Sequence, residues 1–460
     1  MKKAVSLLLA LVMTLTLFTA CGGNNSSSGN NPSAGGDSGL PTYDSLKVGE
    51  DYTDITAELR VISHRTDLID TTFTQYVEEF NKLYPNVTIN YEGITNYADD
   101  MTTRISSNNW GDICMIPTSI QLPDLNLYFQ PLCDLSAIEA DYNFASNRAY
   151  VGVVYGIPST GNAQGIVYNK KVAEAAGYTT DNMPKTPDEF LQFLQDIKDK
   201  TDAIPLYTNF AAGWTMGAWD AYIGGGATAD PDWMNITMPQ TKDPFADRGD
   251  GTGPYAVYKI LYDAVSMGLT EDSPTATDWE GCKPMMNDGR IGTLVLGSWA
   301  IIQMQEVNMD NAADIGYMPF PISVNGTQYA SAGADYCYGV NKASSDDNKI
   351  ASMLYIKWLT ESSNFAYDQG GVPVLKSQAY PDTLAAFDGI TLLEDTPAPT
   401  ELATLQSDVN RESEISLNAD NTHVQRIVEA VITGSETLDD IIADWNARWN
   451  SAVDRYAPQS

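Results

Sequence analysis

Apolar positions recur with two different spacings over residues 59–91. The run 59–62 is short and apolar, which predicts a strand. Over residues 73–83 the apolar side chains recur at helical intervals, and Pro85 ends that pattern. Residues 87–91 then alternate between apolar and polar, as a half-buried strand does. The order of strand, helix and strand predicts the start of a doubly wound α/β sheet.

Amphipathic helices are predicted along the rest of the chain. Thr186, Pro187 and Glu189 form the pattern of a capping box with proline at the first helical position. Stripes of apolar residues at helical spacing, which usually face a core, cover the segments 350–358, 424–431 and 438–449. No low-complexity linker interrupts residues 55–455. Two lobes joined by short strands therefore fit better than separate domains on long linkers.

The N-terminal residues have the pattern of a secretory signal. Lys2 and Lys3 precede an apolar stretch that is too short and too rich in threonine for a membrane span. Small residues directly before Cys21 resemble a bacterial lipoprotein signal, in which the cysteine is lipidated and becomes the mature N-terminus. An ordinary cleaved signal with an incidental cysteine is the alternative. We expect a lipoprotein signal peptide over 1–20, then a lipidated Cys21 and a flexible Gly/Asn/Ser tether over 21–54.

The net charge and the histidine content exclude several classes of partner and site. The chain has 26 Lys and Arg against 60 Asp and Glu, a net charge of −34. Such a polyanion is a poor partner for nucleic acid and for anionic lipid. Its two histidines, His64 and His423, are far apart, which leaves little for a histidine metal site or a serine–histidine–aspartate triad. We expect no cofactor, no metal, no nucleic acid and a monomeric protein.

Few motifs of known chemistry are present. The chain lacks the phosphate-binding, dinucleotide-binding, zinc-protease and nucleophile-elbow patterns. Asp243, Asp247 and Asp250 lack the ligand spacing of an EF-hand and fit a solvated loop better. If a disulfide forms, Cys114 and Cys133 are the local pair, and four buried thiols are the alternative. With 60 carboxylates, an exported glycoside hydrolase stays open as an alternative function.

A series of short segments is spread along the whole body. Residues 111–113 read GDI, residues 155–171 read YGIPSTGNAQGIVYNKK, and residues 285–299 read MMNDGRIGTLVLGSW. Further such segments are DIGY at 314–317, SAGA at 331–334 and GGVP at 370–373. In their order, behind a signal of the lipoprotein type, they resemble the extracellular solute-binding proteins of carbohydrate ABC transporters, the family that contains maltose-binding protein. The resemblance covers about residues 58–455.

This resemblance implies an α/β, two-lobe, periplasmic-binding-protein-like fold with a ligand cleft between the lobes. The hinge crossovers would fall near 160–164 and 331–338. The N-lobe would be 55–160 plus about 336–385, and the C-lobe 161–335 plus about 395–460.

The resemblance also implies a function that is not enzymatic. The protein would be a receptor lipid-anchored on the extracytoplasmic face of the cell membrane. It would capture a sugar or oligosaccharide and deliver it to the permease subunits of an ABC transporter. The same fold binding a non-sugar solute is a further alternative.

Sugars present hydroxyl edges and apolar faces, so their sites need planar hydrogen-bonding groups and aromatic rings. The resemblance places Trp299 where the family stacks an aromatic ring on the sugar, Trp214 more loosely at a second such place, and Asn162 and Asp335 at the crossovers. The alternative for Trp299 is a core tryptophan. The alternative for the loop after the first strand is a solvated polar turn. The candidate ligand-binding residues are Trp299, Trp214, Asp335, Arg65, His64, Asp67, Asn162, Ser119 and His423.

Overall fold

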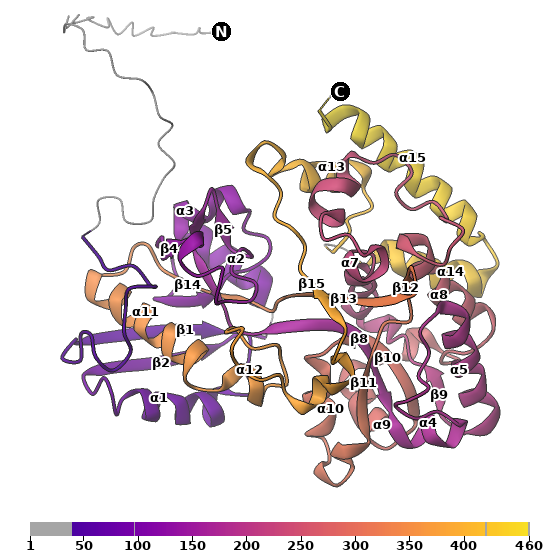
Figure 1. Ribbon diagram of the computed structural model, residues 1–460, viewed down its shortest axis with the longest axis horizontal. Helices are drawn as coiled ribbons and strands as arrows, with labels where there is room; N and C mark the ends of the chain where they lie inside the picture. The colour runs from indigo at the N-terminus through magenta and orange to yellow at the C-terminus, as the bar shows by residue number, and fades with distance from the viewer. Residues whose placement is uncertain (1–38, 96, 419–420, 459–460) are drawn as a thin grey trace, which may run out of the picture. The chain divides into compact units, whose positions relative to one another are not determined.

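The computed structural model describes residues 39–95, 97–418 and 421–458. The expected signal peptide and Cys21 lie outside this part of the chain. Within it, no helix is both long enough and apolar enough to span a membrane. Helices and strands alternate along the described chain, and most of the strands form two main sheets (Figure 1).

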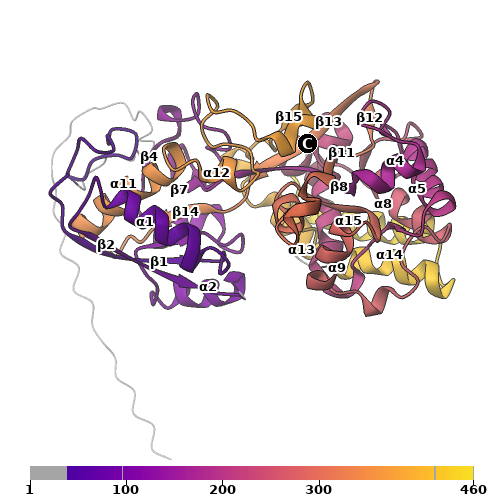
Figure 2. The ribbon, with the colours of Figure 1, turned by 90° about the horizontal axis from the view of Figure 1, so that it is seen from below.

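The first sheet contains five strands in the order β2-β1-β3-β14-β7. Five helices and a small three-stranded sheet, in the order β4-β6-β5, accompany it. The strands and helices of this part are β1 (Ala57–Ser63), α1 (Thr74–Phe80), β2 (Val87–Gly93), α2 (Tyr97–Ser106), β3 (Ile113–Met115), α3 (Leu125–Tyr128), β4 (Cys133–Asp134), β5 (Ala149–Tyr150), β6 (Val153–Val154), β7 (Gly156–Pro158), β14 (Cys337–Val340), α11 (Asp346–Glu361) and α12 (Phe365–Asp368). Strands β1, β2 and β3 are parallel, and β14 runs antiparallel to both β3 and β7. Helices α1 and α11 lie side by side on one face of the sheet and α2 on the other (Figure 2). The predicted strand–helix–strand unit at the start of the chain is confirmed.

Helix α1 is shorter than the apolar spacing predicts. It ends at Phe80, with Asn81 at the C-cap, and Leu83 is 38% exposed instead of facing the core. The Asn81 amide donates hydrogen bonds to the Tyr84 and Val87 carbonyl oxygens, which turns the chain towards β2. The local bonds of Asn81 therefore end the helix before Pro85 does.

Residues 40–54 belong to the packed body. Tyr43 is fully buried in the core around the first sheet, and Leu46 is buried beside it. The Tyr43 hydroxyl lies 3.1 Å from the Thr360 hydroxyl of α11. The body therefore begins before residue 55, where the sequence analysis places the end of the tether.

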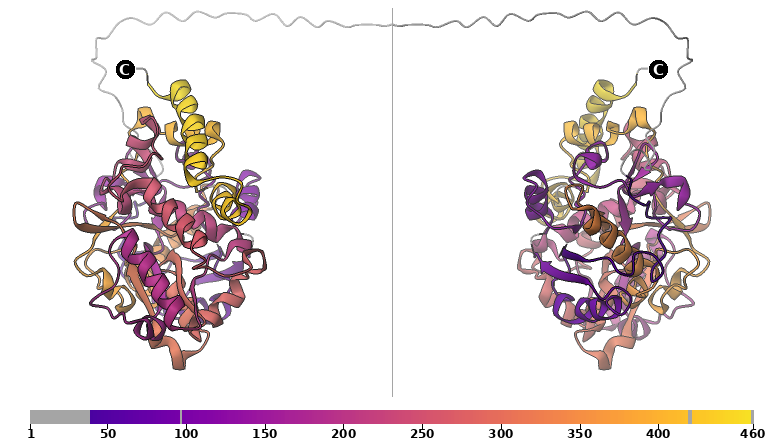
Figure 3. Two further views of the ribbon diagram at one scale, coloured as in Figure 1. Left: turned by 90° about the vertical axis from the view of Figure 1, so that its right-hand side faces the viewer. Right: turned by 90° about the vertical axis from the view of Figure 1, so that its left-hand side faces the viewer.

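The second sheet has the order β12-β13-β8-β10-β9, with β11 paired to β8 and β15 paired to β13. Its strands and helices are β8 (Gly161–Asn169), α4 (Lys170–Ala176), α5 (Pro187–Lys200), β9 (Ile204–Leu206), α6 (Trp214–Gly217), α7 (Gly225–Thr228), α8 (Gly253–Ser266), α9 (Trp279–Asn287), β10 (Ile291–Gly297), α10 (Ala300–Gln305), β11 (Ile315–Pro319), β12 (Ser323–Val324), β13 (Thr327–Ala334), β15 (Thr391–Leu393), α13 (Leu405–Ser413), α14 (Thr422–Thr433) and α15 (Leu438–Tyr456). Helix α8 packs against α5, α14 and α15, and α13 packs along α15 (Figure 3, left). Their apolar faces enclose a second core.

Helix α5 shows how far local rules hold. Thr186 caps it as predicted, because its hydroxyl accepts a hydrogen bond from the Glu189 amide at 3.3 Å. The Glu189 carboxylate, however, accepts from the Lys185 amide and not from the amide of Thr186. The reciprocal half of the capping box is therefore displaced by one residue.

The chain passes between the two sheets over two very short connections and once more through the longer segment 369–390 between α12 and β15. It leaves β7 for β8 through residues 159–160 and leaves β13 for β14 through residues 335–336. The two connections are hydrogen-bonded to each other, from the Asp335 amide to the Thr160 carbonyl and from the Ser159 amide to the Tyr336 carbonyl, both at 2.9 Å. They lie within or next to the two segments where the resemblance places crossovers.

Candidate functional site

Three tryptophans from different elements meet at the second sheet, and we call them the tryptophan cluster. Trp214 begins α6, Trp279 begins α9, and Trp299 lies just after β10. The ring centroids are 5.0 Å apart for Trp214 and Trp279, and 5.7 Å apart for each of these rings and Trp299. Trp214 is 42% exposed, and the other two rings are half-buried. The cluster therefore presents aromatic surface to solvent and is not part of a closed core.

The turn before Trp299 determines where its ring lies. A Cβ atom on Gly297 would come within 2.9 Å of the Trp299 ring, so the glycine makes room for the indole. Ser298 is fully buried, and its hydroxyl accepts a hydrogen bond from the Ala163 amide of β8 at 3.1 Å. The small pair Gly297-Ser298 thus fixes the ring beside β8.

Trp279 is not among the site residues predicted from the sequence. A local signal for it exists: Asp278 caps α9, with its carboxylate accepting from the Gly281 amide at 2.7 Å. A capped first residue lies at a helix end, where a large ring is less often enclosed. The Lys283 ammonium lies 4.9 Å from the Trp279 ring centroid, a distance typical of a cation–π contact.

Polar groups at the crossovers form a chain that reaches the tryptophan cluster, and we call it the crossover network. The Asn162 amide donates to the Asp335 carboxylate at 3.2 Å, and the Ser298 hydroxyl lies 3.5 Å from the Asn162 carbonyl oxygen. His64, at the end of β1, places its Nε2 3.7 Å from Asp335 Oδ2. The network therefore runs from the first sheet to the turn that holds Trp299. The structure thus brings together five of the predicted site residues, namely His64, Asp335, Asn162, Trp299 and Trp214.

The His64 ring lies among aromatic side chains. Its centroid is 4.6 Å from that of Tyr336 and 5.8 Å from that of Tyr97. Burial lowers the pKa of His64, the Asp335 carboxylate opposes that effect, and the Arg65 guanidinium adds to it. The net direction is downward, so the imidazole is neutral at pH 7.

Arg65 and Asp67 bind each other on the loop after β1. Arg65 Nη2 donates to Asp67 Oδ2 at 2.6 Å, and Arg65 Nε donates to Asp67 Oδ1 at 2.9 Å. Burial raises the pKa of Asp67, but the hydrogen bond and charge of Arg65 outweigh it, so the pKa lies below its usual value. A ligand role for this ion pair stays a prediction. Ser119 is exposed, with its hydroxyl 2.6 Å from that of Thr102, and its ligand role also stays a prediction.

A ligand-binding role for His423 does not fit the structure, and that prediction is wrong. The residue is buried in the second core, where its Nε2 lies 2.9 Å from Asp220 Oδ1. Its ring also contacts Trp445, with centroids 5.5 Å apart. The apolar residues around it on α14 face the core, and Asp220 supplies the partner that makes burial of the imidazole possible.

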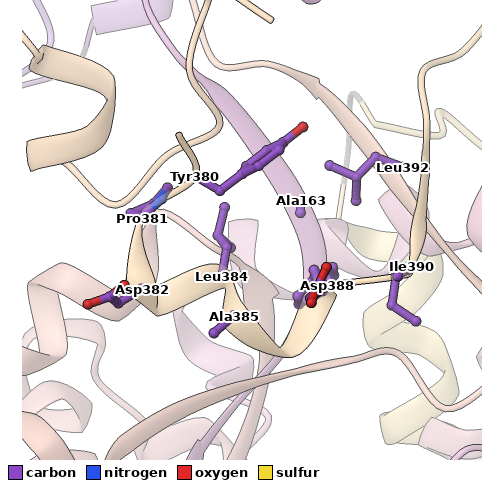
Figure 4. A pocket seen from close by; sticks show the side chains of 11 residues that line it. Ala163, Tyr380, Pro381, Asp382, Leu384, Ala385, Asp388, Ile390 and Leu392 are labelled. Atoms are coloured by element: carbon purple, nitrogen blue, oxygen red, sulfur yellow. The ribbon is translucent and has the colours of Figure 1, made fainter. Parts of the chain in front are cut away.

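A pocket of about 460 Å³ lies on the other face of β8 from the crossover network (Figure 4). Ala163 of β8 lines it together with Tyr380, Leu384 and Leu392. Successive residues of a strand point to opposite faces, so Ala163 faces away from the Asn162 side chain. The lining is mainly apolar, and it does not include the tryptophan cluster.

A second, more polar pocket of about 290 Å³ is lined by an acidic pair. Glu394 accepts a hydrogen bond from the Ser146 hydroxyl at 3.2 Å. Burial, and then the neighbouring charge of Glu394, raise the pKa of Asp395 to about 6. Gln121 and Gln406 contribute amides to the same lining.

The acidic loop over 243–250 has a local explanation. Asp247 accepts a hydrogen bond from the Gly249 amide at 2.8 Å, and Asp250 accepts from the Thr252 amide and hydroxyl. Across residues 39–95, 97–418 and 421–458, no group of three acidic, histidine or cysteine side chains could hold a metal ion. Cys114, Cys133, Cys282 and Cys337 are buried and free, so the Cys114–Cys133 disulfide does not form.

Two sheets with separate cores, short paired crossovers and a polar and aromatic site beside them define a two-lobe binding protein. The chain belongs to the bacterial extracellular solute-binding proteins, whose family profile matches residues 66–364. Membership of this family implies an extracytoplasmic location, and the family is one of binding proteins and not of enzymes.

Solved structures of similar proteins support the same assignment. The chain is 44% identical to BlMnBP1, an ABC-transporter binding protein from Bifidobacterium animalis subsp. lactis solved with mannobiose, with a TM-score of 0.85. It is 41% identical to BlMnBP2 of the same organism, a manno-oligosaccharide-specific solute-binding protein solved with mannotriose, also with a TM-score of 0.85. Each comparison covers 90% of this chain and 99% of the other. The expected two-lobe fold is confirmed.

A curated sequence relative is more distant. The multiple sugar-binding protein of Streptococcus mutans is 23% identical over 350 residues, which is 71% of this chain and 77% of that protein.

Proposed function

We propose that this protein binds manno-oligosaccharides outside the cytoplasm and delivers them to the permease of an ABC transporter. The observation that carries the proposal is the tryptophan cluster joined to the crossover network. The likeness to two proteins solved with mannobiose and mannotriose supports the choice of sugar.

The chemistry of the site suits a pyranose. The C–H face of a sugar ring is apolar and packs on an indole, while its hydroxyl groups need donors and acceptors at the ring edge. Trp214, Trp279 and Trp299 supply the apolar surface. Asn162 and Asp335 supply planar polar groups next to it.

Calorimetric titration of the purified protein tests the proposal. We expect mannobiose and mannotriose to bind and maltotriose and raffinose, as matched oligosaccharide controls, to bind far more weakly. Equal affinity for maltotriose would contradict the manno-oligosaccharide assignment, and no binding of any sugar would favour a non-sugar solute. Release of reducing ends during the incubation would favour the glycoside hydrolase. Solution scattering of the saturated protein should show a smaller radius of gyration, because hinge closure about the crossovers brings the lobes together.

We also propose that Cys21 is lipidated and anchors the protein to the outer face of the cell membrane. The small residues before Cys21 and the extracellular family support this. Several acyl chains hold a protein firmly where one chain is marginal. Changing Cys21 to serine should release the protein into the medium or periplasm, and unchanged membrane fractionation with normal export would contradict the anchor.

A further inference from the structure

A gap between two polar side chains interrupts the crossover network. His64 Nε2 and Asp335 Oδ2 are 3.7 Å apart, which is too far for a direct hydrogen bond. An oxygen atom beside the pair, at about 2.8 Å from both, would lie within hydrogen-bond distance of each. Both side chains stay partly open to solvent, at 22% and 29% exposure. Both side chains are therefore accessible to one oxygen atom bound beside them.

The surroundings of His64 determine which nitrogen carries the proton. A neutral imidazole has one N–H donor and one bare acceptor nitrogen. Nδ1 is buried and has no hydrogen-bond partner among the described residues, and a buried N–H without a partner is costly. Nε2 faces the negative charge of Asp335. The proton therefore lies on Nε2, which points a donor into the gap.

Asp335 offers the matching acceptor. Its Oδ1 accepts from the Asn162 amide at 3.2 Å, which orients the carboxylate. Its Oδ2 receives no hydrogen bond from any residue that the structure describes. One donor and one acceptor thus face the same point.

We propose that His64 and Asp335 together hold a single hydroxyl group of the bound sugar and make the site select for a free hydroxyl at that position. The hydroxyl accepts from His64 Nε2–H and donates to Asp335 Oδ2. This inference rests on the proposed function and adds to it the residues that read one position of the ligand.

Other groups fit this gap badly. A methyl ether accepts a hydrogen bond but cannot donate to Asp335, an ammonium group cannot accept from His64, and a deoxy position does neither. Water can satisfy both side chains in the free protein, so the pair contributes more to discrimination between ligands than to affinity. A site built for a hydroxyl rejects a ligand that lacks it because its polar groups stay unpaired.

The test is a titration of monodeoxy mannobioses against wild type and variants. In wild type, one deoxy position should lose about 10- to 100-fold in affinity, the range of a hydrogen bond to a charged group. In Asp335→Ala and in His64→Leu, the penalty at that position should fall to less than about threefold. His64→Gln retains an N–H donor and should recover part of the discrimination. Asp70→Asn, an exposed carboxylate change six residues after His64, should retain all of it.

Several outcomes would overturn the inference. If wild type binds mannobiose but no deoxy penalty depends on His64 or Asp335, the pair does not read a hydroxyl, while the proposed function stands. If wild type binds no manno-oligosaccharide, the proposed function fails, and the inference fails with it.

Nitrogen-15 NMR of histidine-labelled protein provides a second measurement that needs no variant. The chain has only two histidines, so the ring signals are readily assigned. A proton on Nδ1 of His64 at neutral pH would overturn the inference.

Discussion

Two regions of this protein use the same four residue types in opposite ways. In the second core, Asp220 accepts hydrogen bonds from the Tyr258 hydroxyl and the Asn418 amide, both at 2.8 Å, and lies 2.9 Å from His423 Nε2. Trp445 packs against the rings of Tyr258 and His423. Asp220 and Trp445 are fully buried.

Beside the crossovers, His64, Asp335, Tyr336 and Trp299 form the second set. Here the histidine and the aspartate are 3.7 Å apart, and one carboxylate oxygen has no donor among the described residues. The tryptophan packs on two other half-open rings and not in a core. Residue type therefore does not separate a core group from a candidate ligand-binding group, whereas burial and the direct contact between histidine and aspartate do.

The largest expected effect separates the two aspartates. Changing Asp220 to alanine removes the acceptor of three hydrogen bonds in a buried site, and we expect a loss of about 3–5 kcal/mol of unfolding free energy. The same change at the partly exposed Asp335 should cost less than about 1 kcal/mol. Urea unfolding of both variants makes the measurement. Equal losses would mean that the crossover network is as structural as the core.

Trp445 and Trp299 should also differ in how much each contributes to stability and to binding. Trp445→Ala should lose about 3–5 kcal/mol of stability, as core aromatic truncations do. Trp299→Ala should unfold almost like wild type but bind mannobiose more weakly by about 2–4 kcal/mol, or roughly 30- to 700-fold. Thermal unfolding of the free proteins beside calorimetric titration distinguishes these outcomes. A Trp299 variant that melts far below wild type, yet binds normally while folded, would place that ring in the core.

The smallest expected effect concerns Asp395, a half-buried carboxylate with no histidine partner. Its pKa is about 6 in the folded protein, above the usual 3.8, so the folded state binds more protons between these values. Stability therefore falls as pH rises through this window. Asp395→Asn cannot ionise and should raise stability at pH 7 by roughly 1–3 kcal/mol but not at pH 4. Thermal unfolding at both pH values, with the exposed Asp388→Asn as control, makes the test, and a variant less stable at pH 7 would contradict it.

Much of the fold was predictable because it follows from local rules. The alternation over 87–91 and the capped start of the helix at Thr186 appear in the structure as β2 and α5. The order of short motifs also predicted segments that contain or adjoin the two short connections, since that order reflects a whole family and not one local pattern. The second sheet's strand order, by contrast, depends on contacts between distant segments and was not deduced from local pattern.

The site was only partly predictable, for a related reason. His64 and His423 look alike in sequence, because each is a polar residue beside an apolar run. Only tertiary contacts show that Asp220 lies within hydrogen-bond distance of His423 in a buried site, and that His64 and Asp335 stay farther apart and partly open to solvent. Trp279 was missed because the local signal, the Asp278 cap, does not show that α6, α9 and β10 bring three rings together.

The position of β14 constrains how this chain can fold after export. Strand β14 lies inside the first sheet, between β3 and β7, although its residues come after nearly all of the second sheet in the chain. The first sheet is therefore incomplete until residues 337–340 are available. Pairings between such distant residues form slowly, because a long loop must close before they contribute stability. A chain that emerges N-terminus first thus has no finished first lobe until about three quarters of its residues have crossed the membrane.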